Sequence, residues 1–193
     1  MRYTDKRCDI MEAALELIAE HGFHGAPMSD IAEKAGVAAG TIYRYFESKD
    51  ILINELNQEL ETIVSSLLLE EFPEGGTVQE RFCHVVRALF RYFIDHPLQF
   101  RFMEQYSYSP YGVSRRRDKL LGIRGDADRQ LFRMAIEEGV AEATLKNFPV
   151  MVLCGLAFGP MVSLVRDHIL GFIHLDDVLI DRITEACWDA VKR

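Results

Sequence analysis

The chain has 193 residues, of which 49% are hydrophobic and 27% are charged, as is ordinary for a soluble globular protein of one or two domains. Apolar residues recur at spacings of three and four, and alternating β-branched runs are missing, so the sequence predicts an all-α fold. The net charge of −8 excludes any binding of nucleic acid that depends on overall positive charge, because phosphate contacts require lysine and arginine. Residues 1–50 contain six basic and nine acidic side chains, so such binding would have to depend on where the charges lie.

The four cysteines, Cys8, Cys83, Cys154 and Cys187, form no C-x-x-C pair, so the sequence contains no zinc or dithiol motif. Their wide spacing and apolar neighbours predict buried, reduced thiols, with a redox-sensing cysteine as the alternative. The first ten residues lack the apolar segment of a signal peptide. These features predict a cytoplasmic protein, and no metal or cofactor is expected.

Three helices are predicted in the first 50 residues, over 9–21, 28–35 and 39–45. Gly22 ends the first and Gly36 the second, because glycine adopts a positive φ easily. Beyond them we expect helices over 49 to about 72, 77–95, 98–106, about 115–138 ending at Gly139, about 144–170 with a kink at 159–160, and 176–191. Residues 107–114 are expected to form a loop.

The first 48 residues read as a compact three-helix unit with a glycine-centred turn, the helix-turn-helix arrangement. We therefore predict a helix-turn-helix domain over 1–48 and a second helical domain over 49–193. On the helix over 39–45, Ile42 and Phe46 share the inward face, because they are four residues apart. The side chains left pointing outward are Thr41, Tyr43, Arg44 and Tyr45. Hydroxyls and a guanidinium so exposed suit phosphate oxygens and base edges, whereas the alternative is a surface helix without a partner.

One stretch also resembles a known family: "AALELIAEHGFHGAPMSDIAEKAGVAAGTIYRYFESKDILINEL", within about residues 10–56. It resembles, without a gap, the DNA-binding domain of the tetracycline-repressor (TetR/AcrR) family of bacterial transcription regulators. The resemblance implies a homodimer that reads a palindromic DNA operator, with one recognition helix in each major groove. By position, it implies contacts to phosphates from Thr41, Tyr43, Tyr45 and Lys49, and to bases or adjacent backbone from Ser29, Ala39, Gly40 and Arg44.

The chain departs from the family pattern at two helix starts. Pro27 stands where the family often has a capping Ser or Thr, and proline offers no capping oxygen. Ala38 and Ala39 stand where a serine and a basic residue are common. We therefore expect Arg44 to carry most of the direct base readout. Arg2, Lys6 and Arg7 are expected to form either an arm that contacts phosphates or a disordered tail.

The second domain is rich in aromatic residues and methionine, which line adaptable apolar cavities well. The family resemblance implies a cavity for a small-molecule inducer, here expected to be apolar or amphipathic, which weakens operator binding. The alternative is that these residues are plain core. The candidate ligand-binding residues are Phe90, Phe102, Met103, Tyr106, Phe132, Met151 and Phe158. A basic run (Arg115, Arg116, Arg117 and Lys119) is expected to be a solvated helix start, or to hold an anionic ligand head or contact DNA.

Residues 147–165 form a run without charged side chains, and this run is long enough to span a bilayer. The run holds two prolines and two glycines, and the flanking helices are amphipathic, so we favour a helix buried by its own core and by a partner. Homodimerisation is therefore predicted through the last two helices, about 148–171 and 176–191. In the final helix, the expected main stripe is Leu179, Ile183, Ala186, Cys187 and Ala190, with Trp188 off that stripe and facing a second surface.

Two other functional classes remain as alternatives. An enzyme is disfavoured because the sequence lacks H-E-x-x-H, G-x-S-x-G, P-loop and Glu-x-x-His motifs. A helical protein-interaction module without sequence-specific DNA binding is conceivable, given the acidic balance and Ala38-Ala39.

Overall fold

The computed structural model describes residues 6–120 and 136–193, with the side chains of 117–120 excepted. The described residues form helices and connecting turns, plus one isolated antiparallel bridge between Leu145 and Lys192, so the all-α prediction is confirmed. The chain divides into two compact units, the described parts of 1–62 with 96–124, and of 63–95 with 125–193. Each unit is considered separately below.

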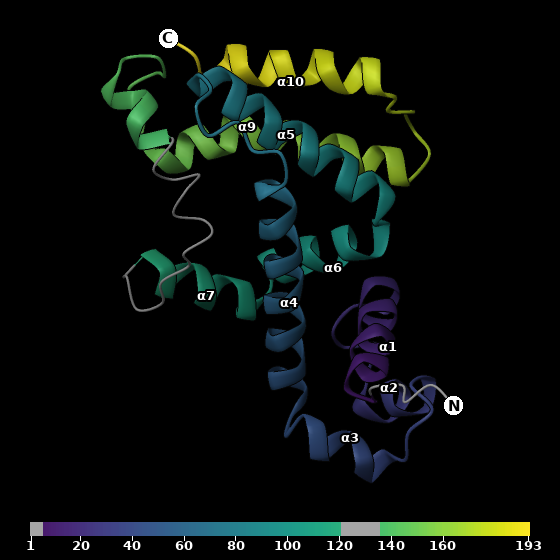
Figure 1. Cartoon of the computed structure of the whole chain (residues 1–193). Coiled ribbons are helices and arrows are strands. Elements are labelled where there is room, and N and C mark those ends of the chain that lie inside the picture. The colour runs from purple at the N-terminus through teal and green to yellow at the C-terminus, as the bar shows by residue number, and fades with distance from the viewer. Residues whose placement is uncertain (1–5, 121–135) are drawn as a thin grey trace. The chain divides into compact units, whose positions relative to one another are not determined.

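The first unit contains most of the predicted helix-turn-helix domain, part of the long helix that follows it, and two later helices (Figure 1). Its elements are α1 (Lys6–His21), α2 (Met28–Lys34), α3 (Ala39–Tyr45), the first two thirds of α4 (Lys49–Leu69), α6 (Pro97–Tyr108) and α7 (Pro110–Leu120). The core includes Ile10, Ile18, Ile31 and Phe46 of the N-terminal segment together with Phe102 of α6. The three N-terminal helices therefore do not close their own core, because α4 and α6 complete it.

The predicted glycine-ended helices are present. Gly22 has φ 74° and Gly36 has φ 65°, a region that residues with a Cβ rarely adopt. After Gly36, the backbone N–H of Val37 donates to the carbonyl of Ala32 at 2.9 Å, which closes the end of α2. The chain thus leaves α2 with a sharp turn and enters α3 three residues later.

Helix α1 begins at Lys6, three residues before the predicted start, and Arg7 explains why. Its guanidinium donates to Glu59 at 2.5 Å and to Glu55 at 2.8 Å, and it lies over the ring of Phe46, 5.5 Å from the centroid. The expectation of an arm or tail is therefore wrong for Arg7, which joins α1 to α4 and α3. Arg2 lies outside the described residues.

Polar side chains join α4 to α6 and α7. The hydroxyl of Tyr106 donates to Asn54 Oδ1 at 2.8 Å, and the hydroxyl of Tyr111 donates to Asp50 Oδ1 at 2.6 Å. The rings of the two tyrosines stack with centroids 6.4 Å apart. The first half of α4 is therefore held both by its apolar side and by these hydrogen bonds.

The predicted loop over 107–114 is wrong, because α6 runs to Tyr108 and α7 begins at Pro110. Only Ser109 separates the two helices. Proline suits the first helical turn, where its missing N–H leaves no bond unmade. The hydroxyl of Ser109 accepts from the backbone N–H of Gly112 at 3.3 Å and so caps the new helix.

The hydrogen bond between Tyr111 and Asp50 predicts a pH-dependent contribution to stability. Donation to the carboxylate, helped by burial, raises the pKa of Tyr111 from 10 to about 12. The unfolded chain loses this proton near pH 10 while the folded chain keeps it, so the stabilisation is complete below pH 10 and is lost as pH rises towards 12. Tyr111→Phe should therefore be less stable than wild type at pH 8, with the difference shrinking above pH 10.

Urea unfolding followed by circular dichroism between pH 8 and 12 would measure that difference. Tyr108→Phe is the matched control, because the Tyr108 side chain is exposed. An identical pH profile for all three proteins would show that the bond to Asp50 contributes nothing.

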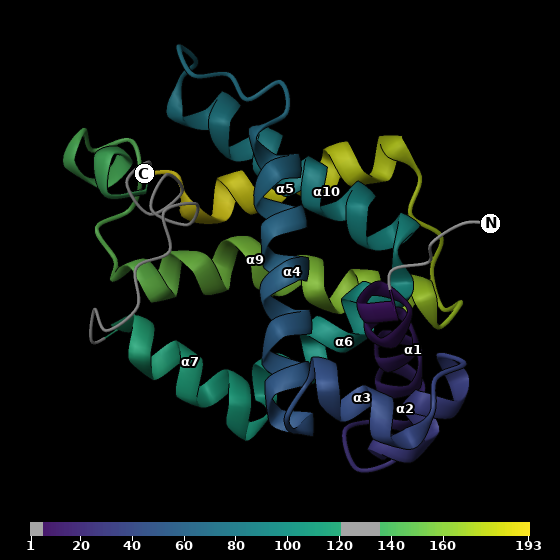
Figure 2. The same cartoon turned by 60° about the horizontal axis from the view of Figure 1, so that its bottom comes forward.

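In the second unit, α5 (Val78–Asp95), α9 (Val150–Ile169) and α10 (Asp177–Val191) pack against one another, and both views show them side by side (Figure 2). Thr77 and Glu80 form a capping box at the start of α5, since the Thr77 N–H donates to Glu80 Oε2 at 2.8 Å and the Glu80 N–H donates to Thr77 Oγ1 at 3.2 Å. The bonds from Thr77 lower the pKa of Glu80.

Helices α5 and α10 run antiparallel, as two ion pairs between them show. Arg87 Nε lies 2.5 Å from Asp181 Oδ1, and Arg91 Nη2 lies 3.0 Å from Asp177 Oδ1. Asp176 caps α10 by accepting from the N–H of Leu179 at 2.8 Å, which places the helix start within one residue of the prediction.

Two predicted helix boundaries in this unit are wrong. Gly139 does not end a helix, because 136–141 is helical, and its carbonyl accepts from the N–H groups of both Thr144 and Leu145 at 2.9 Å. Gly139 is closely packed, since a Cβ there would lie 2.8 Å from the Leu145 side chain, which would have to shift. Most of the predicted helix over 115–138 lies outside the described residues.

Helix α9 begins at Val150 and not near residue 144. Pro149 precedes the first turn with φ −54° and ψ 141°, an extended conformation outside the helical region. Upstream, the Lys146 N–H donates to the Val191 carbonyl at 2.9 Å, and the Arg193 N–H donates to the Thr144 carbonyl at 3.0 Å. Residues 144–146 are therefore paired with the C-terminal residues and are not available for a helix.

The predicted inner stripe of the last helix is also wrong. The buried residues of α10 are Ile180, Thr184, Cys187, Trp188 and Val191, so the stripe is shifted by about one residue. Trp188 packs inside its own unit, with its ring 5.4 Å from that of Phe82. The other predicted stripe residues, Leu179, Ile183, Ala186 and Ala190, remain partly or fully exposed.

The cysteine prediction needs correction as well. Cys187 is buried, but Cys83 and Cys154 are only partly buried and Cys8 is exposed. Burial raises the pKa of Cys83 and of Cys187, which keeps both thiols protonated at neutral pH.

Candidate nucleic-acid interface

Helix α3 is anchored by two side chains and exposes the rest. Ile42 and Phe46 are fully buried, and the Phe46 N–H closes the helix on the Ile42 carbonyl at 3.0 Å. Tyr43 is 53% exposed and Tyr45 is 42% exposed. The predicted division between an inward and an outward face of this helix is confirmed.

The remaining residues predicted on this face are accessible too. Ala39, Gly40 and Arg44 are exposed, and Thr41 is partly exposed. A Cβ built on Gly40 would meet no atom within 4 Å, so this position lies on an open surface. An elongated polyanion could therefore approach the start of α3 closely.

Neither short helix has a side-chain cap, as the two departures from the family pattern predict. Pro27 precedes α2 and Ala38 precedes α3, and both have extended backbone angles without a capping hydrogen bond. The orphan N–H groups at the start of α3 remain open to an outside acceptor such as a phosphate oxygen. Ser29, exposed on α2, donates to the carboxylate of Asp30 at 2.8 Å.

Lys49 differs from the expectation. Its ammonium donates to the carbonyl of Phe23, and the side chain is partly buried. Burial lowers the pKa of Lys49. The cation at a helix start thus already has an oxygen partner within the protein, and a contact from Lys49 to phosphate remains a prediction.

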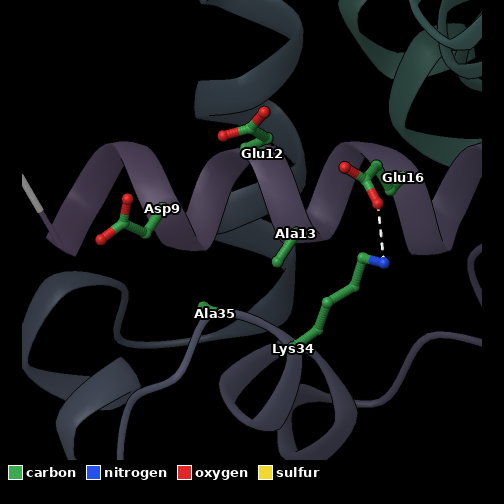
Figure 3. Close-up of a pocket in the computed structure, with 6 residues that line it drawn as sticks. All are labelled: Asp9, Glu12, Ala13, Glu16, Lys34 and Ala35. Carbon is green, nitrogen blue, oxygen red and sulfur yellow. Dashed lines mark ion pairs between the residues drawn. The ribbon is translucent and has the colours of Figure 1, made fainter. Parts of the chain in front are cut away.

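The surface between α1 and α2 is acidic. A shallow pocket of about 310 Å³ lies between α1 and α2 and is lined by Asp9, Glu12, Ala13, Glu16, Lys34 and Ala35 (Figure 3). Its one ammonium, that of Lys34, lies 2.7 Å from Glu16 Oε2. Three carboxylates against one paired ammonium repel phosphate, so α3 presents the more suitable surface for nucleic acid. Among the described residues, no group of three or more His, Cys, Asp or Glu side chains is placed to hold a metal ion.

The candidate ligand-binding residues are divided between the two units. Phe102, Met103 and Tyr106 belong to the core of the first unit or pack against it. In the second unit, Phe90 is fully buried, Phe158 is partly buried and Met151 is half exposed. Phe132 lies outside the described residues. A ligand-binding role for these residues remains a prediction.

Sequence reasoning missed the contacts that hold this surface in place. Arg7 pairs with Glu55 and Glu59, and Gln105 donates to the carbonyl of Ala19 at 3.2 Å. The partners are 48 to 86 residues apart in the chain, so no local pattern signals them.

Comparison with known proteins agrees with this geometry. Residues 10–56 match the family model described as bacterial regulatory proteins, tetR family, and residues 77–192 match the tetracyclin repressor-like C-terminal domain. The fatty acid metabolism regulator protein of Bacillus subtilis (strain 168) is 40% identical over 86 residues, and this alignment spans 44% of each chain.

Two solved structures resemble nearly the whole chain. A TetR family transcription regulator from Marinobacter aquaeolei VT8 has a TM-score of 0.85 and 25% identity, over 97% of this chain and 95% of that one. The transcriptional regulator FadR from Bacillus subtilis, solved in complex with stearoyl-CoA, shares the fold with a TM-score of 0.72 and 22% identity, over 94% of this chain and 95% of that one. The chain belongs to the TetR family of bacterial regulatory proteins.

Proposed function

We propose that the protein is a cytoplasmic DNA-binding transcriptional regulator, a repressor that binds a palindromic operator as a homodimer. Residues 1–48 carry DNA binding, and 49–193 carry ligand binding and dimerisation. The observation that carries the proposal is α3, a two-turn helix held by buried Ile42 and Phe46 that exposes Tyr43, Arg44 and Tyr45. Large side chains kept outside a core in this way are suited to a groove of DNA.

Dimerisation is supported by the outward face of α9. Val152, Gly155, Leu156 and Gly159 are all exposed and lie on one side of this helix. By length and composition α9 could cross a membrane, and only 22% of its most apolar 18-residue window is buried within the chain. A second copy related by a two-fold axis would cover this surface with its own α9 and with the partly or fully exposed residues of α10 named above. Gly155 and Gly159 would allow the two helices to approach closely.

The proposed inducer is an amphipathic molecule with an acyl chain. The relative in Bacillus subtilis is named a fatty acid metabolism regulator, and FadR was solved with stearoyl-CoA. Inducer binding would shift the spacing of the two recognition helices and release the operator.

Selection of bound fragments from the source genome, with purified protein at two salt concentrations, would test the proposal. Enrichment of a short palindrome, weaker at high salt, is the expected result. No enrichment at low salt would favour the helical protein-interaction module instead.

Arg44→Ala should lower the affinity for the selected operator by about 30- to 100-fold, because a bidentate arginine contact to guanine contributes roughly 1–3 kcal/mol of discrimination and the charge also attracts phosphate. Affinity for random DNA should fall much less. Fluorescence anisotropy with both DNA molecules measures the two effects. Arg91→Ala, which removes the same charge from an exposed site on α5, is the matched control. Equal losses for the two variants would mean that Arg44 contributes only its charge.

A further inference from the structure

One side of α4 in the first unit is polar along most of its length. Asp50, Asn54, Asn57 and Glu61 follow one another at spacings of four, three and four, which places them on one face of the helix. Asp50 and Asn54 accept hydrogen bonds from Tyr111 and Tyr106, and Glu61 forms an ion pair with Arg115 of α7. This face, called the polar seam below, is turned towards α6 and α7.

Asn57 is the exception within the polar seam. Its side chain is 2% exposed, and among the described residues its amide nitrogen Nδ2 has no hydrogen-bond partner. A buried donor without an acceptor is costly, and native proteins contain few of them. The two neighbours of Asn57 along the seam, Asn54 and Glu61, have hydrogen-bonding partners on α6 and α7 respectively. The amide of Asn57 therefore lies in a polar environment.

The polar seam also binds a cation, the guanidinium of Arg115. Asn57 and Glu61 are one helical turn apart, so their side chains are neighbours, and Glu61 binds Arg115. The Arg115 and Glu61 side chains are only 11% and 18% exposed, so the pair lies in a region that little water reaches. Next to it, Arg116 adds a second, exposed cation in a chain whose net charge is −8.

We propose that Asn57 and Arg115 bind the anionic head group of the amphipathic inducer, a carboxylate or phosphate whose oxygens accept from both side chains. The ligand oxygen satisfies the free amide of Asn57 and competes with Glu61 for the guanidinium of Arg115. Binding therefore replaces a contact between α4 and α7 by a contact to the ligand. Since α4 follows α3 after three residues, its release from α7 couples the head group to the recognition helix. This inference rests on the proposed amphipathic inducer.

Three probes of equal chain length separate the head-group chemistries: dodecanoate, dodecyl phosphate and dodecanol. Isothermal titration calorimetry with the full chain is expected to show tighter binding of at least one anionic probe than of dodecanol. The tighter-binding of dodecanoate and dodecyl phosphate shows whether the site prefers a carboxylate or a phosphate head group. If neither anionic probe binds the wild type, or if dodecanol binds as tightly, the inference is overturned, whereas enrichment of operator fragments would still support the regulator function.

Two variants with opposite expected signs test the residues. Asn57→Leu fills the same space without a hydrogen-bond donor. It should lower the affinity for the anionic probe about tenfold without lowering Tm. Glu61→Gln removes the competing carboxylate and should raise the affinity for the same probe about tenfold. Glu59→Gln is the matched control, because Glu59 pairs with Arg7 on another side of α4, and its probe affinity should equal that of wild type.

Unchanged affinity in both Asn57→Leu and Glu61→Gln, in a protein that binds the anionic probe, would place the head group elsewhere and leave the acyl ligand intact as a proposal. A loss of affinity in Glu61→Gln, or an equal change in Glu59→Gln, would show that these residues act only through the stability of α4.

Discussion

Replacing Leu156 with glutamate is expected to convert the proposed dimer into monomers and to abolish tight operator binding. Leu156 is 37% exposed in one protomer, so the charge is tolerated in the monomer. In the dimer each glutamate would lie unpaired against its partner's apolar helix, where desolvation costs several kcal/mol per charge. The dissociation constant of the dimer should therefore rise by more than about 1,000-fold.

Sedimentation velocity at micromolar concentration would detect this change directly. Val113→Glu is the matched control, since it makes the same kind of change at an exposed valine of α7, outside the proposed interface. Circular dichroism should show that both variants keep their helices. If Leu156→Glu remains dimeric, the two-fold contact does not include the outward face of α9.

Phe46→Ala should destabilise the first unit by about 3–5 kcal/mol, because deleting a fully buried aromatic ring removes its burial and leaves a cavity. This is a large fraction of the roughly 5–15 kcal/mol that stabilises an ordinary domain. The ring ends α3, and the Arg7 guanidinium lies over it, so its removal also loosens the contact of α3 with α1. Operator affinity should fall together with stability.

Urea unfolding followed by circular dichroism would measure the free energy of unfolding. Phe148→Ala deletes the same ring at a half-exposed position and should cost much less. Loss of operator binding by Phe46→Ala without loss of stability would contradict a core role for Phe46 and would place its ring at the DNA.

The helix-turn-helix segment could be predicted closely, because its signals are local. Gly22 and Gly36 end helices through a positive φ that depends only on the residue type, and Ile42 and Phe46 share a face because they are four residues apart. The same reasoning failed at Gly139 and at Trp188. There the outcome depended on Leu145, whose side chain packs closely against Gly139, and on Phe82, whose ring packs against the indole ring of Trp188.

The sequence by itself therefore determined the helical class, the positions of α1 to α4 within a few residues, and the outward face of α3. Helical period, glycine and proline act within one or two turns, so they can be read along the chain. Only the tertiary structure decided which partners the charged and polar side chains found. Arg7 joined α1 to α4 through Glu55 and Glu59, and Lys49 turned to the Phe23 carbonyl. The amide nitrogen of Asn57 was left buried, with no hydrogen-bond partner in the part of the chain that the structure describes. These outcomes depend on atoms brought together from segments tens of residues apart, and a hydrogen bond requires a matching distance and direction that no sequence spacing specifies.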